Sequence, residues 1–529
     1  MQLYSAQFVA FLGVALVAYF ALGHIRPKIQ WTVLLVASMV FYFATGWQNL
    51  FFILLTAGST WVLGLVFSKL EAQSKAARDA IKDRKEKKAI KARFNRKKWY
   101  ALLAGLVLNF GVLSYIKYWN ALLEAVGYGD SFLASSLLLP LGLSFYTFQS
   151  VGYLIDAYNG KYPPESNFAK YLLFVSFFPQ LIQGPINRFD ALAGQLYENH
   201  SFEMDRTRRA LILIGFGIMK KYAIANLLAQ TVGGCLDGIT GSTPGSIIVF
   251  GILMYSAQQY ADFSGGIDMV RGVAMLFGVK MAENFRQPYF SISLGDFWRR
   301  WHITLGAWMR DYVFYPFALT KPMQSLGKWA SSTIKSDLGK HLGRTLPASI
   351  ANILVFFLVG LWHGAEAHFI WWGLYNGFVI AAADLLAPLF AKMIKAFKVN
   401  VESAGWHVFR IVRTFIVVNI GWYFDRILDF GDCMQGFYNT LFNFAPGQFM
   451  TAFHDLGIRD VKYCLALAAI GCLVVFVVSV LRERGVDVEG AILKQNWIVR
   501  FGIYAFVVLL TLGAFMFAPV DGGFMYANF

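Results

Sequence analysis

Long apolar runs recur from one end of the sequence to the other, beginning with residues 3–22 and ending with residues 501–518. Because a helix needs about 20 apolar residues to cross the hydrocarbon of a bilayer, this pattern predicts about eleven to fourteen transmembrane or re-entrant helices. Two runs, residues 133–154 and 294–319, are interrupted by Pro or Gly, and the second also by charged residues. Such interruptions predict broken, re-entrant or interfacial helices. The expected fold is an all-α polytopic membrane protein.

The polar stretches between the runs predict the orientation of the chain. The longest, residues 69–98, is rich in Lys and Arg and in residues that favour helices. The positive-inside rule places it in the cytosol, beside anionic lipid headgroups. A second basic loop, with Arg482, Arg484, Lys494 and Arg500, precedes the last apolar run, which would carry residues 519–529 to the outer face. The first run follows no basic residues and precedes no cleavage pattern, so it is expected to be an uncleaved span.

Composition supports a membrane location and argues against other classes. Of the 529 residues, 57% are hydrophobic and 15% are charged, and the mean hydropathy of +0.51 is far above that of a soluble protein. The net charge of +16 could suggest nucleic acid, but the basic residues are grouped beside the apolar runs, so no nucleic-acid partner is expected. The four cysteines lack metal-ligand spacing and are expected to pack in the core.

Polar residues inside a membrane protein are costly, and the first cluster of them lies at residues 140–150 and 178–189. Both segments interrupt apolar runs with Pro, Gly and amide side chains, among them Gln149 and Gln183. Irregular backbone at this depth is tolerated where it lines a cavity or is buried in protein. The sequence leaves two interpretations open, a site lining and helix kinks satisfied by neighbouring helices.

The second cluster comprises residues 262–272 and 284–312 and contains His302. If residues 296–312 form one helix, His302 shares a face with Trp298, Leu305, Gly306 and Met309. In that arrangement Arg299, Arg310 and Asp311 are better placed for headgroups, phosphates or one another. A single histidine on an apolar face is more often a core residue than a catalyst, but the density of Trp, Arg and Asp here favours a site.

The third cluster, residues 358–373, places His363 between Gly360 and Gly364. A GxxxG pair predicts a close helix contact, in which the histidine would only bond a neighbouring helix. An imidazole with a pKa near neutrality is, on the other hand, the natural general base for activating a hydroxyl. His363, Glu366 and His368 do not follow the spacing of zinc signatures, so no metal site is expected.

At these residues the sequence resembles the membrane-bound O-acyltransferase superfamily, in particular its bacterial alginate O-acetyltransferase-like branch, which is related to the teichoic-acid D-alanyl transfer protein. The motifs PLGLSFYTFQSVGYLIDAY, FFPQLIQGPINRF, DFSGG, ENFRQPY, DFWRRWHITL and GLWHGA follow in the family's order over residues 140–373. The resemblance departs from the family pattern at Asn376, in DFSGGID, and at residues 316–319. These departures put the acceptor and the acyl group in question.

The resemblance implies a fold and a site. It implies a ring of helices around a thinned centre, in the bacterial cytoplasmic membrane, with His363 as the active-site histidine and His302 as the second histidine of this branch. The expected division is N-terminal transmembrane helices at 1–68, a basic cytosolic segment at 69–98, the catalytic core at 99–390, C-terminal transmembrane helices at 391–518 and an outward tail at 519–529. The residues expected to line the site are Trp298, Arg300, Trp301, Asp311, Trp362, Gln149, Gln183 and Asp262.

The final residues, FMYANF, look like the aromatic C-terminal motif of this branch and suggest that Tyr526 carries the acyl group. The resemblance implies no permanently bound cofactor, acetyl-CoA or an acyl carrier thioester as co-substrate, an extracytoplasmic esterase-like partner, and a surface polysaccharide as final acceptor. Two alternatives stay open. One is D-alanyl transfer from a carrier protein toward teichoic acid, and the other is a polysaccharide exporter or scaffold without chemistry.

Overall fold

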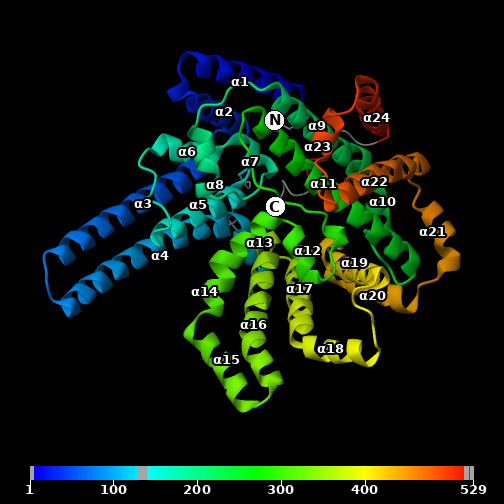
Figure 1. Cartoon of the computed structure of the whole chain (residues 1–529). Helices are drawn as coiled ribbons and strands as arrows, with labels where there is room; N and C mark the ends of the chain where they lie inside the picture. The colour runs from blue at the N-terminus through cyan, green and yellow to red at the C-terminus, as the bar shows by residue number, and fades with distance from the viewer. Residues whose placement is uncertain (1–4, 129–139, 518–522, 525–529) are drawn as a thin grey trace. The chain divides into compact units, whose positions relative to one another are not determined.

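The computed structural model describes residues 5–128, 140–517 and 523–524, and in these ranges the chain is helical (Figure 1). Across the described residues the only β-pairing is one antiparallel bridge between Phe285 and Trp301. Seven of the described helices are long and apolar enough to cross a membrane, or eight if the bent pair α17 (Ala367–Leu385) and α18 (Ala387–Ala396) forms one span. The prediction of an all-α polytopic membrane protein is confirmed. Other apolar runs of the sequence form helices that are shorter, interrupted or more polar.

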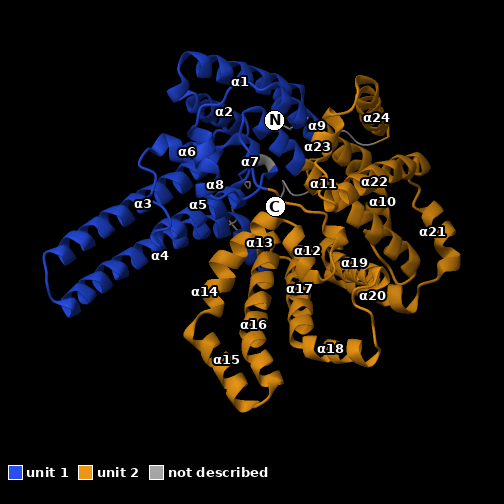
Figure 2. Cartoon of the chain, in the orientation of Figure 1, with its two compact units in different colours: residues 1–214, 267–282 blue, residues 215–266, 283–529 orange. Residues whose placement is uncertain are grey.

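The chain forms two compact units, coloured separately in Figure 2. The first comprises residues 1–214 and 267–282, and the second comprises residues 215–266 and 283–529. Two long helices, α9 (Met204–Lys220) and α11 (Gly245–Leu276), contribute residues to both units. The other helices of the first unit are α1 (Ala6–Ile25), α2 (Trp31–Phe43), α3 (Asn49–Asp79), α4 (Arg84–Ala125), α5 (Leu143–Tyr158), α6 (Phe168–Ser176), α7 (Phe178–Gln183) and α8 (Phe189–Tyr197).

The basic stretch of the first unit is helical, as its composition predicts. It forms the polar ends of α3 and α4, which run side by side as a long hairpin (Figure 1). The side chain of Asp83 accepts hydrogen bonds from the backbone N–H groups of Lys85 and Glu86 and so begins α4. Glu71 lies 3.4 Å from both Arg78 and Lys98 and links the two helices.

The buried amides of the first polar cluster bond mainly to their own neighbours. Gln149 donates to the carbonyl of Phe174 at 3.1 Å and to Gln180 at 3.4 Å, and Asn187 donates to Gln180 at 3.2 Å. For Gln149 this arrangement matches the interpretation in which neighbouring helices satisfy a kink. Gln183 differs, because it is fully buried and neither atom of its amide has a hydrogen-bond partner among the described residues.

The second unit carries both histidines of interest. A π-helical turn, η2 (Lys221–Asn226), follows α9, and another, η4 (Arg310–Phe314), follows α13. The remaining helices of this unit are α10 (Leu227–Leu236), α12 (Leu294–Arg300), α13 (Ile303–Met309), α14 (Tyr315–Ala318), α15 (Lys321–Thr333), α16 (Asp337–His363), α17, α18, α19 (Ala404–Arg426), α20 (Phe430–Phe442), α21 (Phe449–Asp455), α22 (Val461–Glu483), α23 (Val488–Leu493) and α24 (Trp497–Phe515).

The contact between α16 and α17 depends on glycine. A side chain at Gly360 would collide with the carbonyl of Phe369, and its Cβ would lie 3.3 Å from the Cα of Gly373. The close helix contact predicted from the GxxxG pair therefore exists. It fixes the end of α16, which is His363, against α17.

Candidate active site

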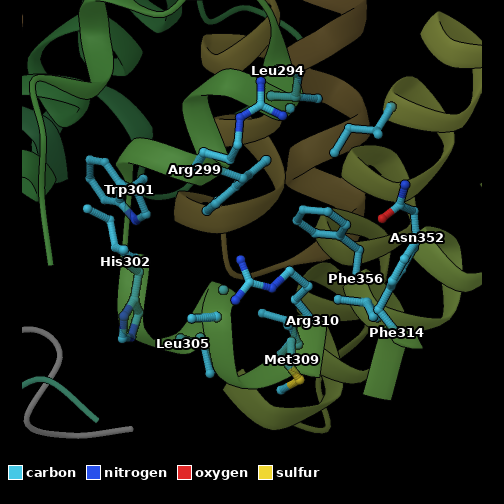
Figure 3. A pocket seen from close by; sticks show the side chains of 18 of the residues that line it. Leu294, Arg299, Trp301, His302, Leu305, Met309, Arg310, Phe314, Asn352 and Phe356 are labelled. Carbon is cyan, nitrogen blue, oxygen red and sulfur yellow. The ribbon is translucent and has the colours of Figure 1, made fainter. Parts of the chain in front are cut away.

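A cavity of about 540 Å³ lies within the second unit, between α12, α13 and η4 on one side and α16 and α17 on the other. His302 and His363 both line it. Figure 3 shows Trp301 and His302 at one side of this cavity and Phe356 and Asn352 of α16 at the other. Its volume is in the range of sites that bind small organic ligands. The structure therefore brings the second and third polar clusters of the sequence together.

His302 lies at a break in the chain, so residues 296–312 do not form the one helix that was considered for them. Helix α12 ends at Arg300, α13 begins at Ile303, and His302 between them has the left-handed conformation with φ 46°. This conformation costs a non-glycine residue about 1 kcal/mol or more, and such strain is concentrated at functional sites. The interruption itself was predicted for the run 294–319, and its position at the histidine is new.

A short antiparallel pairing between residues 284–286 and residues 300–303 stabilises this break. Arg286 donates its backbone N–H to the carbonyl of Arg300 at 2.9 Å, and Ile303 donates to the carbonyl of Asn284 at 3.0 Å. The side-chain oxygen of Asn284 also accepts from the backbone and hydroxyl of Thr304, at 3.0 and 2.9 Å, and lies 3.3 Å from Nδ1 of His302. The ENFRQPY motif thus positions the imidazole through Asn284.

The imidazole of His302 is buried and neutral. It lies outside the long apolar helices, against the ring of Phe263 at 4.9 Å and that of Trp362 at 6.4 Å. Burial lowers the pKa of His302 to about 3. A neutral imidazole can donate one N–H bond or accept one, so His302 can orient a polar ligand without carrying charge.

His363 ends α16 and is 5% exposed. Its ring lies 4.8 Å from that of Trp362, 5.2 Å from that of Trp372 and 5.8 Å from that of Phe369. The helix contact at Gly360 and the cavity position of His363 are both present, so the two interpretations of this motif are compatible. The glycine contact holds the helix end, and the histidine faces the cavity.

Aromatic side chains form much of the cavity wall. Trp298 and Trp301 line the cavity as expected, whereas Trp362 touches both histidines by ring contacts. Trp298 donates its indole N–H to Asn376 at 2.9 Å, so the residue that departs from the family pattern supports the wall. Trp372 also lines the cavity, and its indole N–H has no hydrogen-bond partner among the described residues. It is available to a ligand.

The arginines that line the cavity are not the one expected there, Arg300. Arg299 and Arg310 line it, and their side chains are 72% and 57% exposed. Arg300, expected at the site, instead bonds Glu483 at 2.9 Å and Asp296 at 3.3 Å. Asp311 pairs with Arg310 at 2.8 Å and is not among the residues of the cavity wall.

One face of α16 was not singled out from the sequence. Asn352, Phe356 and Val359 line the cavity and precede His363 at helical spacing. That spacing, counted back from the histidine, is the signal that could have found them.

The other expected site residues are not among those that line this cavity. Gln149 and Gln183 belong to the first unit, and Asp262 forms a buried ion pair with Lys221 in the second. Tyr526 lies outside the described residues, as does part of the run 133–154. Among the described residues no three His, Cys, Asp or Glu side chains are grouped so as to hold a metal ion. His368 contacts the carbonyl of Phe424 at 2.9 Å.

Comparison with known proteins agrees with this fold. The model of the membrane-bound O-acyltransferase family matches residues 164–334. The probable alginate O-acetylase AlgI of Pseudomonas aeruginosa is 32% identical over 448 residues, which are 83% of this chain and 74% of that protein. The peptidoglycan O-acetyltransferase of Helicobacter pylori is 30% identical over 79% of this chain and 74% of its own. The teichoic acid D-alanyltransferase of Bacillus subtilis is 29% identical over 54% of this chain and 69% of its own.

These likenesses, and the helical architecture that accompanies them, show that the chain belongs to the membrane-bound O-acyltransferase family. It is a multi-pass membrane protein and an O-acyltransferase. The resemblance drawn from its motifs is confirmed.

Proposed function

We propose that this enzyme passes an acetyl group from acetyl-CoA, on the cytosolic side, across the membrane for O-acetylation of an extracytoplasmic polysaccharide. The observation that carries the proposal is that His302 and His363 line one cavity with aromatic walls and two arginines. The names of the relatives add support, since two of them designate acetyl transfer, one to alginate and one to peptidoglycan.

In the proposed reaction His363 is the general base. Its neutral imidazole takes the proton of an attacking hydroxyl while that oxygen bonds to the thioester carbonyl carbon. The C–S bond then breaks, and the thiolate that leaves takes the proton back from the imidazolium. The products are an O-acetyl ester and free coenzyme A. The enclosed aromatic surroundings of His363 exclude water from this step.

Trp372 would stabilise the negative oxygen that develops on the thioester carbonyl, and His302 would orient the thioester substrate through Nε2, because its Nδ1–H is directed to Asn284. Acyl-transfer enzymes place fixed hydrogen-bond donors where this charge appears. The Nδ1 of His302 is held near Asn284, and the indole N–H of Trp372 is buried on the cavity wall. Both groups are thus fixed before the substrate binds.

The attacking hydroxyl in this proposal is that of Tyr526. A tyrosine ester on the outer face could then deliver the acetyl group to an esterase-like partner, which would move it to the polysaccharide. The charge pattern of the sequence, which predicts an outward tail, supports this order of transfer.

Recognition of coenzyme A is assigned to Arg299 and Arg310. Guanidinium groups bind phosphate oxygens in pairs of hydrogen bonds, and coenzyme A carries phosphates at a distance from its thioester. Arg310 pairs with the adjacent Asp311. Arg299 has Asp296 at 3.8 Å and interacts with Asp384 of the cavity wall. Both side chains are largely exposed and line the cavity that holds the histidines.

Replacing both arginines by alanine should raise the KM for acetyl-CoA about tenfold and leave kcat nearly unchanged, because two charged hydrogen-bond donors to the donor substrate are lost. Steady-state kinetics with acetyl-CoA and with acetyl-pantetheine, which lacks the nucleotide phosphates, measure this. The KM for acetyl-pantetheine should not change.

Arg459→Ala is the matched control. Arg459 is 94% exposed, pairs with the next residue, Asp460, as Arg310 pairs with Asp311, and lies away from the cavity wall. An equal change in KM for both donors in the double variant would contradict phosphate recognition.

D-alanyl transfer is the second candidate, favoured by the likeness to the teichoic acid D-alanyltransferase. Activity with a D-alanyl carrier thioester and none with acetyl-CoA would establish it and overturn acetyl transfer. Membership of an acyltransferase family argues against an exporter or scaffold without chemistry.

A further inference from the structure

A buried ion pair in the second unit binds residues close to the end of the chain. Lys221 Nζ lies 2.5 Å from Asp262 Oδ1, and the two side chains are 3% and 1% exposed. The same ammonium donates to the carbonyl of Gly523 at 2.9 Å and lies 4.9 Å from the centre of the Phe524 ring. Phe524 is itself 4% exposed.

The backbone around the pair places both charges at this point. Lys221 is the first residue of the π-helical turn η2, and π-turns inside helices are frequent at functional sites. A Cβ on Gly265 would lie 2.8 Å from the carbonyl of Gly217 and 3.4 Å from the backbone nitrogen of Lys221. Only glycine therefore lets α11 approach this turn so closely. The DFSGG motif thus supplies the carboxylate, Asp262, and the space that brings it to the lysine.

The contacts of Lys221 are of the kind that bind a peptide segment, because they involve a backbone carbonyl and an aromatic side chain of the same segment. Burying two opposite charges is costly even when they are paired, so a pair that only joined η2 to α11 could be replaced by apolar residues. Here the ammonium has donors left over after Asp262, and one of them reaches a backbone carbonyl 302 residues further along the chain. The aromatic face above the ammonium adds a cation–π contact, which is strongest where water is excluded.

We propose that Lys221 and Asp262 anchor Gly523 and Phe524 and so position Tyr526, two residues further on, for acyl transfer. The second part rests on the function proposed above, whereas the anchoring does not. Lys221 and Phe524 are thus positioning residues for the acyl-accepting tail.

Release of the tail can be measured by thiol labelling. Met525→Cys is introduced into a chain whose four native cysteines are alanine, and the rate of maleimide labelling at residue 525 is followed by intact mass. Anchoring of the two preceding residues is expected to slow this labelling. Phe524→Leu keeps an apolar side chain but removes the aromatic face, and should label about tenfold faster. Phe524→Trp keeps the face and should label at close to the parent rate.

Two further variants test the ion pair. Lys221→Met combined with Asp262→Asn removes both charges without leaving one buried alone, and should also label about tenfold faster. Lys220→Met is the control, because Lys220 is buried beside Lys221 but donates to Ser264, at 2.9 Å. If the Lys221→Met, Asp262→Asn variant fails to fold, the comparison of Phe524→Leu with Phe524→Trp still tests the anchor. Parent-like labelling of Phe524→Leu would overturn the anchor.

The acyl-transfer consequence is measured separately, in chains that retain Met525. Phe524→Leu should lower kcat about tenfold with the KM for acetyl-CoA unchanged, and Phe524→Trp should restore kcat. Faster labelling with unchanged kcat would overturn the positioning of Tyr526 and count against the tyrosine relay, while leaving the anchor established.

Discussion

Replacing His363 by alanine is expected to lower acyl transfer by about 10² to 10⁴-fold, because the proposed general base is removed. The chain should remain folded, since the glycine contact that fixes the end of α16 is untouched. Turnover of acetyl-CoA by the purified protein, together with its elution as a single species in detergent, measures both parts of this prediction.

His368→Ala is the matched control for His363. His368 is also buried and lies at the start of the neighbouring helix, but it bonds the carbonyl of Phe424 and does not line the cavity. Its loss removes a buried imidazole without removing a group from the proposed reaction. Activity retained in His363→Ala, or lost equally in both variants, would show that the base lies elsewhere.

The second large effect is expected at His302. His302→Ala should reduce kcat by about 10²-fold, because the thioester loses a group that orients it and a misplacement of about 1 Å can cost that much. Because burial keeps this imidazole neutral, with a pKa of about 3, the residual pH profile of the variant should match that of the parent between pH 6 and about 8. The measurement is kcat as a function of pH.

Variants of Asn284 test whether the orientation of His302, and not only the presence of its imidazole, matters for activity. Asn284→Asp keeps an oxygen acceptor for Thr304, whereas Asn284→Ala leaves its backbone and hydroxyl donors without this acceptor. Activity should fall further in the alanine variant than in the aspartate variant. If His302→Ala keeps parent kcat, the histidine is only a packing residue.

Sequence patterns predicted much of the fold because apolar periodicity and charge act locally. The first apolar run, residues 3–22, overlaps α1, and the interruption of residues 294–319 is real. The two histidines were found because a polar group in an apolar run is costly wherever it lies. These features depend on neighbours in the chain.

Other features depend on distant residues and could not be predicted. Residues 296–312 favour a helix locally, but the pairing with residues 284–286 breaks it at His302. That break decides which arginine faces the cavity. Arg300 turns to Glu483, a partner 183 residues away, and Arg299 lines the wall. Lys221 likewise reaches the carbonyl of Gly523, 302 residues further along the chain.

The central claim is that an acetyl group passes from a cytosolic thioester to Tyr526 by way of His363. The direct measurement is mass-spectrometric mapping of the modified residue after the purified protein is incubated with isotopically labelled acetyl-CoA. The account predicts labelled acetyl on Tyr526 in the parent protein, and none in Tyr526→Phe or His363→Ala. Equal labelling of the parent and Tyr526→Phe would contradict it.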